Sequence, residues 1–165
     1  MEISQRELQE YMTKCIELAK KVPDKVGKPY VGVLVISNSG KIVGEGYKTL
    51  LEGTDYLIHA ERKALGQAES HAKGGCLVTT LEPCVMVTRR QVFKSCSELI
   101  VETGIQLVVV GLLDNSPSVN RGSGIGYLVE QGVQVQRYED LNSIIISELM
   151  QRKYSQSFFK QSDKR

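Results

Sequence analysis

The sequence has little of what marks membrane, secreted and nucleic-acid-binding proteins. No apolar run approaches the roughly 20 residues that a membrane-spanning helix needs, and residues 1–7 carry acidic side chains without the apolar segment of a secretory signal. A formal net charge of +2 is too small to imply a nucleic-acid partner. Aromatic residues, which stack on single-stranded bases, make up only 6% of the chain. We therefore expect a cytoplasmic protein with no membrane contact.

Cysteine is scarce as well. The chain has four cysteines, and in a reducing cytosol cysteines are more often metal ligands or core residues than disulfides. Cys15 falls on the apolar face of a predicted helix and Cys76 begins a predicted strand, so both are expected in the core. Cys84 and Cys96 are the candidate ligands.

The rest of the composition is that of a soluble globular protein. Hydrophobic residues make up 41% and charged residues 24% of the 165 residues, which suits one ordinary domain with a substantial core. No internal repeat or low-complexity linker divides the chain. We expect a single domain over residues 1–158 and a flexible tail, rich in Lys, Ser and Gln, over residues 159–165.

Hydrophobic periodicity predicts alternating strands and helices. Helical spacing and capping-box patterns predict helices at 4–22, from 57 or 59 to 71, from 95 to 104, at the end of 120–131 and at 140–154. Apolar and β-branched runs predict strands at 30–36, 41–47, 76–81, 105–113 and 133–136, with a loop at 48–56. The strand–helix–strand order makes the fourth and fifth strands parallel through a right-handed crossover. The expected fold is a three-layer α/β/α domain around a five-stranded mixed sheet.

One histidine, two cysteines and a glutamate are the chain's strongest chemical signal. His59 and Glu61 lie in the first turn of a predicted helix, Cys84 lies at the end of a predicted strand, and Cys96 opens another helix. One imidazole and two thiolates leave the fourth position of a tetrahedral zinc ion open for water, which is typical of a catalytic site. His-x-Glu followed by Pro-Cys is part of the zinc deaminase signature, although eleven residues rather than two separate the cysteines here.

Each of these residues also has an ordinary structural alternative. A histidine at a helix start is usually packed or capping, and a cysteine at a strand end is usually in the core. His71, the only other histidine, is interpreted as a favourable cation near a helix end. All three ligands in this order, at strand and helix ends, nevertheless favour a Zn²⁺ site.

The motifs resemble those of the cytidine deaminase superfamily, and within it the deaminase domain of the riboflavin-biosynthesis bifunctional protein. The resemblance covers roughly residues 5–145. Its matching segments are Pro29-x-Val31-Gly32, Gly44-Glu45-Gly46-Tyr47, His59-Ala60-Glu61, Thr80-Leu81-Glu82-Pro83-Cys84, Leu113-Asp114, Gly122, Gly124, Gly132 and Leu141-Asn142. It implies a cytidine-deaminase-like fold, one zinc ion, zinc-bound hydroxide that attacks the amine-bearing ring carbon, and Glu61 as proton shuttle. It also implies a homo-oligomer.

Substrate contacts are expected around the metal site. The backbone of Ala60 and the carbonyl of Glu82 or Pro83 would orient the base edge, and Asp114 matches a pocket residue of the resembled family. Where that family usually has Asn, His and Asn, this chain has Lys28, Lys48 and Ser116. Basic residues also gather between the two cysteines, at Arg89, Arg90 and Lys94. This cluster is either a solvated loop or a phosphate site, since guanidinium groups suit phosphate oxygens.

Three functions are compatible with these features. The preferred one is a zinc-dependent hydrolase that deaminates a small aminopyrimidine or nucleotide-like ring, because Glu61 accompanies the open metal position. The second is a polynucleotide-editing deaminase acting on tRNA or single-stranded DNA, whose binding would weaken steeply with salt and favour oligomers. The third is a non-catalytic zinc-stabilised binding module, in which another side chain would close the fourth coordination position.

Overall fold

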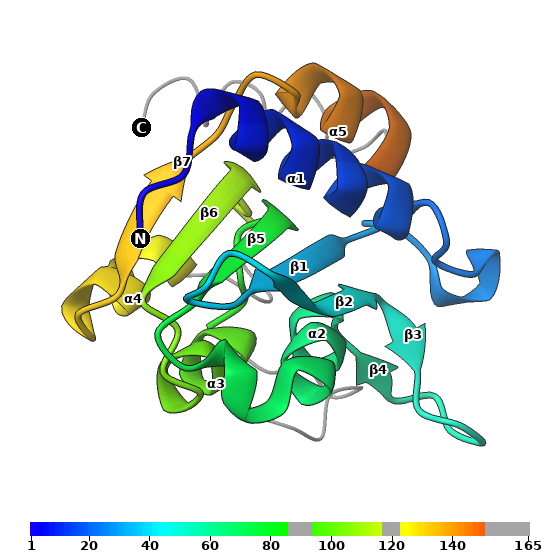
Figure 1. Cartoon of the computed structure of the whole chain (residues 1–165). Helices are drawn as coiled ribbons and strands as arrows, with labels where there is room; N and C mark the ends of the chain where they lie inside the picture. The colour runs from blue at the N-terminus through cyan, green and yellow to red at the C-terminus, as the bar shows by residue number, and fades with distance from the viewer. Residues whose placement is uncertain (86–93, 117–122, 151–165) are drawn as a thin grey trace.

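A five-stranded mixed sheet forms the centre of the computed structural model, which describes residues 1–85, 94–116 and 123–150 (Figure 1). In spatial order its strands are β2 (Ile42–Tyr47), β1 (Gly32–Ile36), β5 (Cys76–Leu81), β6 (Leu107–Leu112) and β7 (Gln134–Arg137). Strand β1 is antiparallel to both β2 and β5, whereas β5, β6 and β7 are parallel. The predicted sheet, with its fourth and fifth strands parallel, is confirmed.

Helices cover both faces of this sheet, which confirms the three predicted layers (Figure 1). The helices α1 (Gln5–Ala19) and α5 (Asn142–Leu149) lie on one face. On the other face lie α2 (Ala60–Ala68), α3 (Cys96–Glu102) and α4 (Gly124–Glu130), the last beside β7. Strands β1, β5 and β6 are buried along their whole length because both of their faces are covered.

The first helix shows how local sequence sets these elements. The Ser4 side chain accepts from the Glu7 N–H while the Glu7 carboxylate accepts from the Ser4 N–H, so the predicted capping box starts α1. Leu8, Met12 and Cys15 recur on its buried face. Cys15 and Cys76 are both fully buried, as predicted for core thiols.

Helix α2 lies directly on strand β2 because two glycines of that strand leave room for the helix backbone. A Cβ atom at Gly44 would lie 2.1 Å from the carbonyl oxygen of Ala64, and one at Gly46 would lie 2.2 Å from the carbonyl oxygen of Ala60. Neither position can hold a larger residue without displacing the helix. The approach at Gly46 fixes the first turn of α2, where His59 and Glu61 lie.

Two stretches differ from the sequence-based expectations. The predicted loop 48–56 contains a short strand, β3 (Thr49–Leu50), which pairs with β4 (Leu57–Ile58) in a hairpin beyond β2 (Figure 1). Helix α2 ends at Ala68 rather than at His71, because Glu69 has a positive φ of 50° and opens the 3-10 turn η2 (Glu69–Ala72). The 3-10 turn η1 (Asp24–Val26) was not predicted either.

Smaller differences occur at the ends of several elements. Helix α1 stops at Ala19 rather than at residue 22, and β7 runs one residue beyond 136. The predicted last helix is confirmed only over Asn142–Leu149. Residues 151–154, expected to end that helix, and the predicted tail at 159–165 lie outside the described residues.

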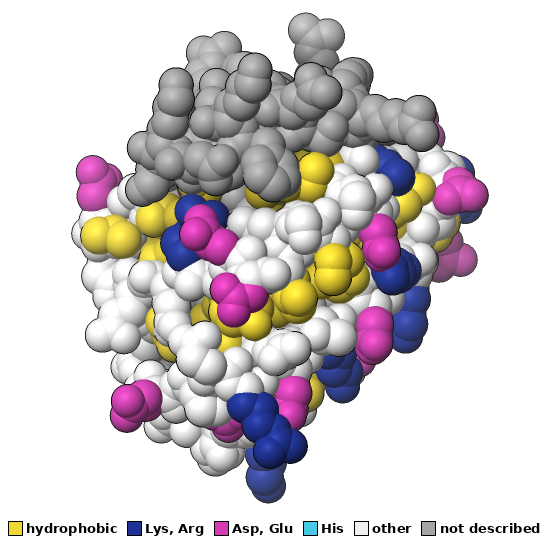
Figure 2. Space-filling model, turned by 90° about the horizontal axis from the view of Figure 1, so that it is seen from above, with side chains coloured by type: hydrophobic (Ala, Val, Ile, Leu, Met, Phe, Trp, Pro, Cys, Tyr) yellow, Lys and Arg dark blue, Asp and Glu magenta, His cyan; other side chains and the backbone are white. Residues whose placement is uncertain are grey.

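Charged side chains of both signs are interspersed on the face seen from above, over α1 and α5 (Figure 2). Among the described side chains drawn there, basic residues do not gather into a patch free of acidic ones. Among all the residues that the structure describes, no helix is both long enough and apolar enough to cross a bilayer.

The close approach of β2 and α2 gives a test of the fold. Gly46→Ala is expected to lower the free energy of unfolding by at least about 2 kcal/mol, since the new Cβ would meet helix backbone. The matched control is Gly66→Ala in α2, where an added Cβ meets nothing within 4 Å. That change is expected to raise stability by about 0.5–1 kcal/mol. Equal destabilisation of both variants in urea titrations would contradict the packing described.

Candidate metal centre

The ends of several strands bring the candidate site together at one edge of the sheet. Gly32, at the start of β1, pairs with Tyr47, at the end of β2, and its N–H donates to the Thr80 hydroxyl near the end of β5. Leu81 pairs with Leu112 at the ends of β5 and β6. Segments that follow β2, β5 and β6 therefore emerge at this edge, which is where parallel sheets commonly place ligands.

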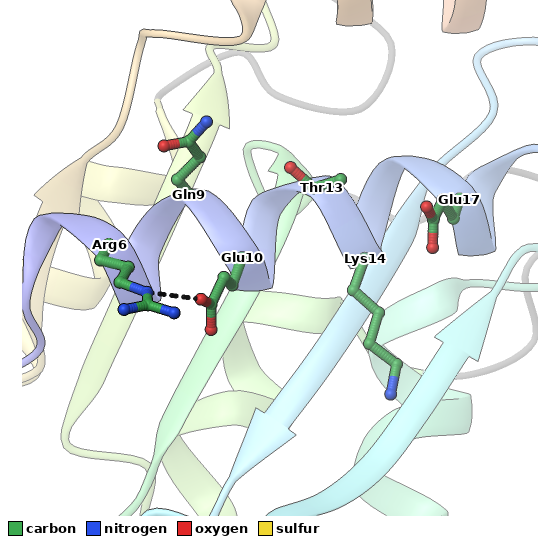
Figure 3. A pocket seen from close by; sticks show the side chains of 6 residues that line it. All are labelled: Arg6, Gln9, Glu10, Thr13, Lys14 and Glu17. Carbon is green, nitrogen blue, oxygen red and sulfur yellow. Dashed lines mark hydrogen bonds and ion pairs between the residues drawn. The ribbon is translucent and has the colours of Figure 1, made fainter.

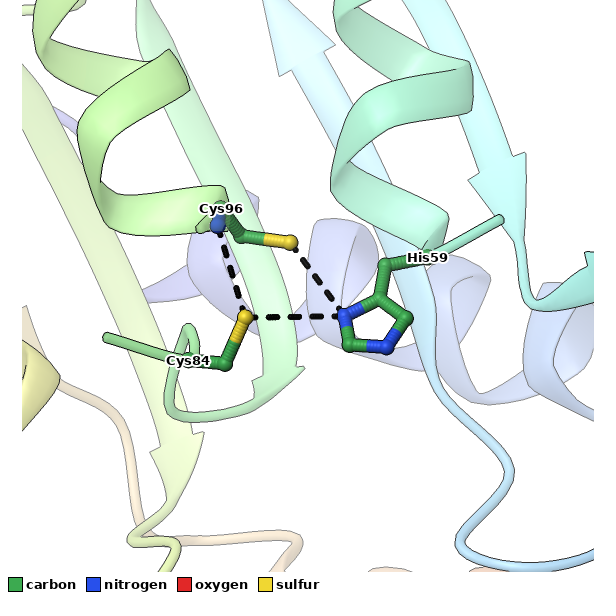
Figure 4. A group of neighbouring side chains, drawn as sticks. All are labelled: His59, Cys84 and Cys96. Carbon is green, nitrogen blue, oxygen red and sulfur yellow. Dashed lines mark hydrogen bonds between the residues drawn. The ribbon is translucent and has the colours of Figure 1, made fainter. Parts of the chain in front are cut away.

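His59, Cys84 and Cys96 meet at this edge, as their sequence pattern predicted (Figure 4). The His59 Nδ1 atom lies 3.6 Å from the Cys84 Sγ and 3.4 Å from the Cys96 Sγ. All three ligand atoms lie within 4.8 Å of one another. Ligand atoms around tetrahedral zinc lie roughly 3.4–3.8 Å apart at bond lengths of about 2.0–2.3 Å, so this donor set fits a zinc ion.

Helix α3 holds the two cysteines together despite the eleven residues between them. The Ser95 side chain accepts from the Glu98 N–H and the Glu98 carboxylate accepts from the Ser95 N–H, a capping box that places Cys96 in the first turn. The Ser97 N–H donates to the Cys84 carbonyl at 3.1 Å, and the Cys96 N–H donates to the Cys84 Sγ at 3.4 Å. The long intervening segment therefore does not separate the sulfurs.

The two thiols form one coupled, mostly buried pair. A hydrogen bond from the Cys96 thiol, followed by that from His59, lowers the pKa of Cys84 to about 4, although burial opposes this. The same shared hydrogen bond and burial raise the pKa of Cys96 well above its ordinary value. Cys84 is therefore a thiolate at neutral pH, and metal binding would displace the remaining proton from the pair.

Glu61 lies beside the three ligands, two residues into helix α2 from His59. Its side chain is buried, with 4% exposed. Burial raises the pKa of this carboxyl, while the neighbouring His59 opposes the rise. A buried carboxyl with a raised pKa beside a metal site is suited to take up and release protons.

The residues predicted to orient the base, Ala60, Glu82 and Pro83, are buried. The Glu82 carboxylate and the Pro83 carbonyl also form hydrogen bonds within the protein. Ala60 is fully buried at the start of α2. The Glu82 carboxylate accepts hydrogen bonds from Asp114, just after β6, and from Ser123 and Ile125, at the start of α4. The Pro83 carbonyl accepts from the Ser97 hydroxyl at 3.3 Å. Direct contact of these groups with a substrate stays a prediction.

The segment after β6 adds polar groups to the same edge. Asp114 is buried, and its Oδ1 accepts from the Ser116 N–H at 2.9 Å. Burial, together with the charges of Glu82 and Cys84, raises the pKa of Asp114 to about 6. Sequence reasoning missed Asn115, whose side-chain Nδ2 and Oδ1 are buried and have no hydrogen-bond partner within the described ranges. Nothing in its sequence context distinguishes this asparagine from an ordinary turn residue.

The basic residues predicted to lie near the substrate differ in burial and in their partners. Lys48 is buried, with 7% exposed, whereas the Lys28 ammonium lies 5.5 Å from the centre of the Tyr30 ring. Lys94 forms an ion pair with Glu102. Arg89 and Arg90 lie outside the described residues, so their contribution stays a prediction.

A shallow hollow lies away from this edge, on the outer surface of α1 (Figure 3). All of its lining residues come from that one helix, namely Arg6, Gln9, Glu10, Thr13, Lys14 and Glu17. Arg6 pairs with Glu10, and Lys14 pairs with Glu45 of β2. These are the ion pairs of a solvated helix surface, which offers a ligand little enclosed space.

Fold and ligand set together define a zinc-dependent deaminase architecture, and comparison with known proteins agrees. The family model described as "Cytidine and deoxycytidylate deaminase zinc-binding region" matches residues 5–112. The chain belongs to this family.

Within this family, the chain is similar to deaminases of riboflavin biosynthesis. The chain is 40% identical over 126 residues to the riboflavin biosynthesis protein RibD of Aquifex aeolicus, covering 76% of this chain and 33% of that protein. It is 34% identical over 151 residues to the diaminohydroxyphosphoribosylamino-pyrimidine deaminase of Buchnera aphidicola subsp. Schizaphis graminum, covering 91% of this chain and 92% of that protein. The chain thus spans about a third of the RibD relative and nearly all of the Buchnera one.

Solved structures agree with this placement. The diaminohydroxyphosphoribosylaminopyrimidine deaminase/5-amino-6-(5-phosphoribosylamino)uracil reductase of Thermotoga maritima superposes with a TM-score of 0.71 at 29% identity. The match covers 94% of this chain and 42% of that one. The cytidine-deaminase-like fold predicted from the motifs is therefore confirmed.

The metal site predicts a dependence on each sulfur. Wild-type protein is expected to retain about one zinc ion per chain, and Cys96→Ala is expected to lose it because only two protein ligands remain. The control is Cys76→Ala, which removes a buried thiol of strand β5 and is expected to keep the metal. Zinc-to-protein ratios after dialysis measure both. Full metal content in Cys96→Ala would contradict the assigned ligand set.

The raised pKa of Asp114 predicts a pH dependence of stability in metal-free protein. Because its folded pKa of about 6 exceeds the ordinary value of 3.8, its contribution is fully present below pH 3.8 and is lost as the pH rises through 6. Asp114→Asn keeps an acceptor for the Ser116 N–H but cannot ionise. It is expected to gain about 2 kcal/mol on wild type between pH 4 and pH 7.5. Parallel stability curves from urea unfolding would contradict this expectation.

Proposed function

We propose that this chain hydrolytically deaminates an aminopyrimidine that carries a phosphorylated substituent. The observation that carries the proposal is the meeting of three ligand atoms, His59 Nδ1 and the Sγ atoms of the two cysteines, with the buried Glu61 carboxyl beside them. The Buchnera relative supports it, because a protein named as a deaminase of such a compound matches this chain over nearly its whole length.

The protein groups would divide the work between holding the metal and moving protons. His59, Cys84 and Cys96 would hold the zinc ion, which when bound supplies a Lewis acid and lowers the pKa of a coordinated water. Glu61 would take a proton from the attacking water and deliver it to the ring nitrogen next to the amine-bearing carbon. A second proton, passed through the same carboxylate, would reach the amine as the carbon–nitrogen bond breaks and ammonia leaves. The ring then carries a carbonyl in place of the amine.

Charged side chains near the metal ligands suit two parts of such a substrate. A carboxyl suits a ring edge that donates hydrogen bonds, and lysines suit an anionic substituent. Asp114, buried after β6, suits the amino and ring N–H groups of a pyrimidine. The Lys48 ammonium acts electrostatically on His59, so its charge reaches the metal site. Lys48 directly follows β2, which ends at this edge, and Lys28 lies four residues before β1. These lysines would suit the phosphoribosyl group in the name of the Buchnera relative.

Polynucleotide editing receives less support. The net charge is +2, and the described part of the α1 and α5 face carries acidic and basic side chains together (Figure 2). A steep loss of binding with salt and a preference for oligomers over mononucleotides would favour it instead.

The function is tested by ammonia release from zinc-loaded protein. Free bases, nucleosides, nucleotides and phosphoribosylamino-pyrimidines are compared, and turnover is expected to be highest with the last group. Glu61→Gln is expected to lower kcat by at least about 10²-fold, since the proton carrier is lost. Its zinc content is expected to stay unchanged.

The matched control is Glu17→Gln on the exposed side of α1, which is expected to keep wild-type turnover. Full activity in Glu61→Gln would refute the assigned mechanism. Zinc retention without ammonia release from any pyrimidine would instead favour the non-catalytic binding module.

A further inference from the structure

The Glu82 carboxylate, just after β5, joins two segments that lie between β6 and β7. Its Oε1 accepts from the Asp114 N–H at 3.1 Å, just after β6. Its Oε2 accepts from the Ser123 hydroxyl and from the Ile125 N–H, each at 3.0 Å, at the start of α4. Only 2% of Glu82 is exposed, and its own N–H donates to the Leu112 carbonyl at 2.8 Å. The side chain is therefore held by its own backbone and in turn holds both neighbours.

This arrangement requires a carboxylate. Two of the three donors are backbone N–H groups, which can only donate, and they approach different oxygens of the side chain. A glutamine offers one acceptor oxygen and one donor nitrogen, so it could satisfy only one of the two N–H groups. A buried carboxylate is costly unless hydrogen bonds of this kind offset its lost hydration.

The groups held by Glu82 border the metal centre. Asp114, on one side, is electrostatically coupled to Cys84 and His59. On the other side, α4 packs so closely on the segment before Cys84 that a Cβ at Gly124 would lie 2.1 Å from the Pro83 carbonyl oxygen. Glu82 is thus linked to the strand end that carries Cys84, to Asp114 and to the start of α4.

We propose that Glu82 is a positioning residue, which fixes Asp114 at the distance from the metal ligands that substrate binding requires. It acts on the substrate only through Asp114, and the inference rests on the proposed function of that residue in pyrimidine recognition. This assigns to the Glu82 side chain a role separate from the base contact predicted for its carbonyl.

The experiment compares Glu82→Gln with Glu7→Gln in steady-state ammonia release and zinc content. Glu7 is the matched control, because its carboxylate accepts from the N–H and the hydroxyl of Ser4 far from the site. Glu82→Gln is expected to raise KM about tenfold while kcat changes less than about threefold, from the loss of a charged hydrogen bond. Zinc content is expected to stay at the wild-type value. Glu7→Gln is expected to change neither KM nor kcat.

A milder variant covers the case in which Glu82→Gln does not fold. Ser123→Ala removes the hydroxyl donor and leaves both backbone N–H donors, so a KM increase of about two- to threefold is expected. Wild-type KM in both variants would overturn the proposal. So would a loss of zinc, or a fall in kcat with unchanged KM, since either result would place the effect on the metal centre or the chemical step.

Hydrogen exchange separates this inference from the proposed function. The amides of Asp114 and Ile125 are expected to exchange faster in Glu82→Gln than in wild type, and those of α1 are not. Faster exchange in a protein that deaminates no pyrimidine would refute the proposed function and leave the positioning contact in place. Unchanged exchange would refute the positioning contact itself.

Discussion

The site depends on two neighbouring helices that begin where the central strand β5 ends. Helix α2 is held there by its backbone contact with Gly46, and α3 is held by hydrogen bonds from Ser97 to the carbonyls of Pro83 and Cys84. Both helix starts present ligands to the same point, because α2 is fixed against strand β2 and α3 against the segment that directly follows β5. The Cys96 N–H directed at the Cys84 sulfur also favours the thiolate that a metal ion needs.

Buried strands, capped helices and metal ligands could be predicted because their signals are local. Strands β1, β5 and β6 are continuous apolar runs, and the capping boxes at Ser4 and Ser95 set two helix starts. The β3–β4 hairpin could not be predicted, because two-residue strands carry no periodicity. The Glu82 contacts could not be predicted either, since its partners lie 32 to 43 residues further along the chain and only the fold brings them close.

Chemistry and substrate choice come from different parts of this architecture. The metal ligands lie at strand and helix ends, whose positions follow from core packing, so a family model over residues 5–112 captures them. The groups suited to recognise a substrate lie in the segments that leave β2 and β6, around Lys48 and Asp114. Such connecting segments vary more readily than the core they leave. A match to the family therefore identifies the reaction more securely than the molecule that undergoes it.

Two buried carboxyls, those of Glu82 and Asp114, lie near the Cys84 thiolate, and their mutual repulsion is unfavourable. The hydrogen bonds around the two carboxyls differ. The Glu82 side chain accepts hydrogen bonds from the Asp114 N–H, the Ser123 hydroxyl and the Ile125 N–H, which offset its lost hydration. Asp114 accepts from the Ser116 N–H, the one such donor to it among residues 1–85, 94–116 and 123–150, and its pKa rises to about 6 under burial and the charges of Glu82 and Cys84. The proposed roles follow this difference, because Glu82 would position its neighbours and Asp114 would keep hydrogen-bonding capacity for a ligand. A pyrimidine amine bound to Asp114 would offset the repulsion between this carboxyl and the charges of Glu82 and Cys84.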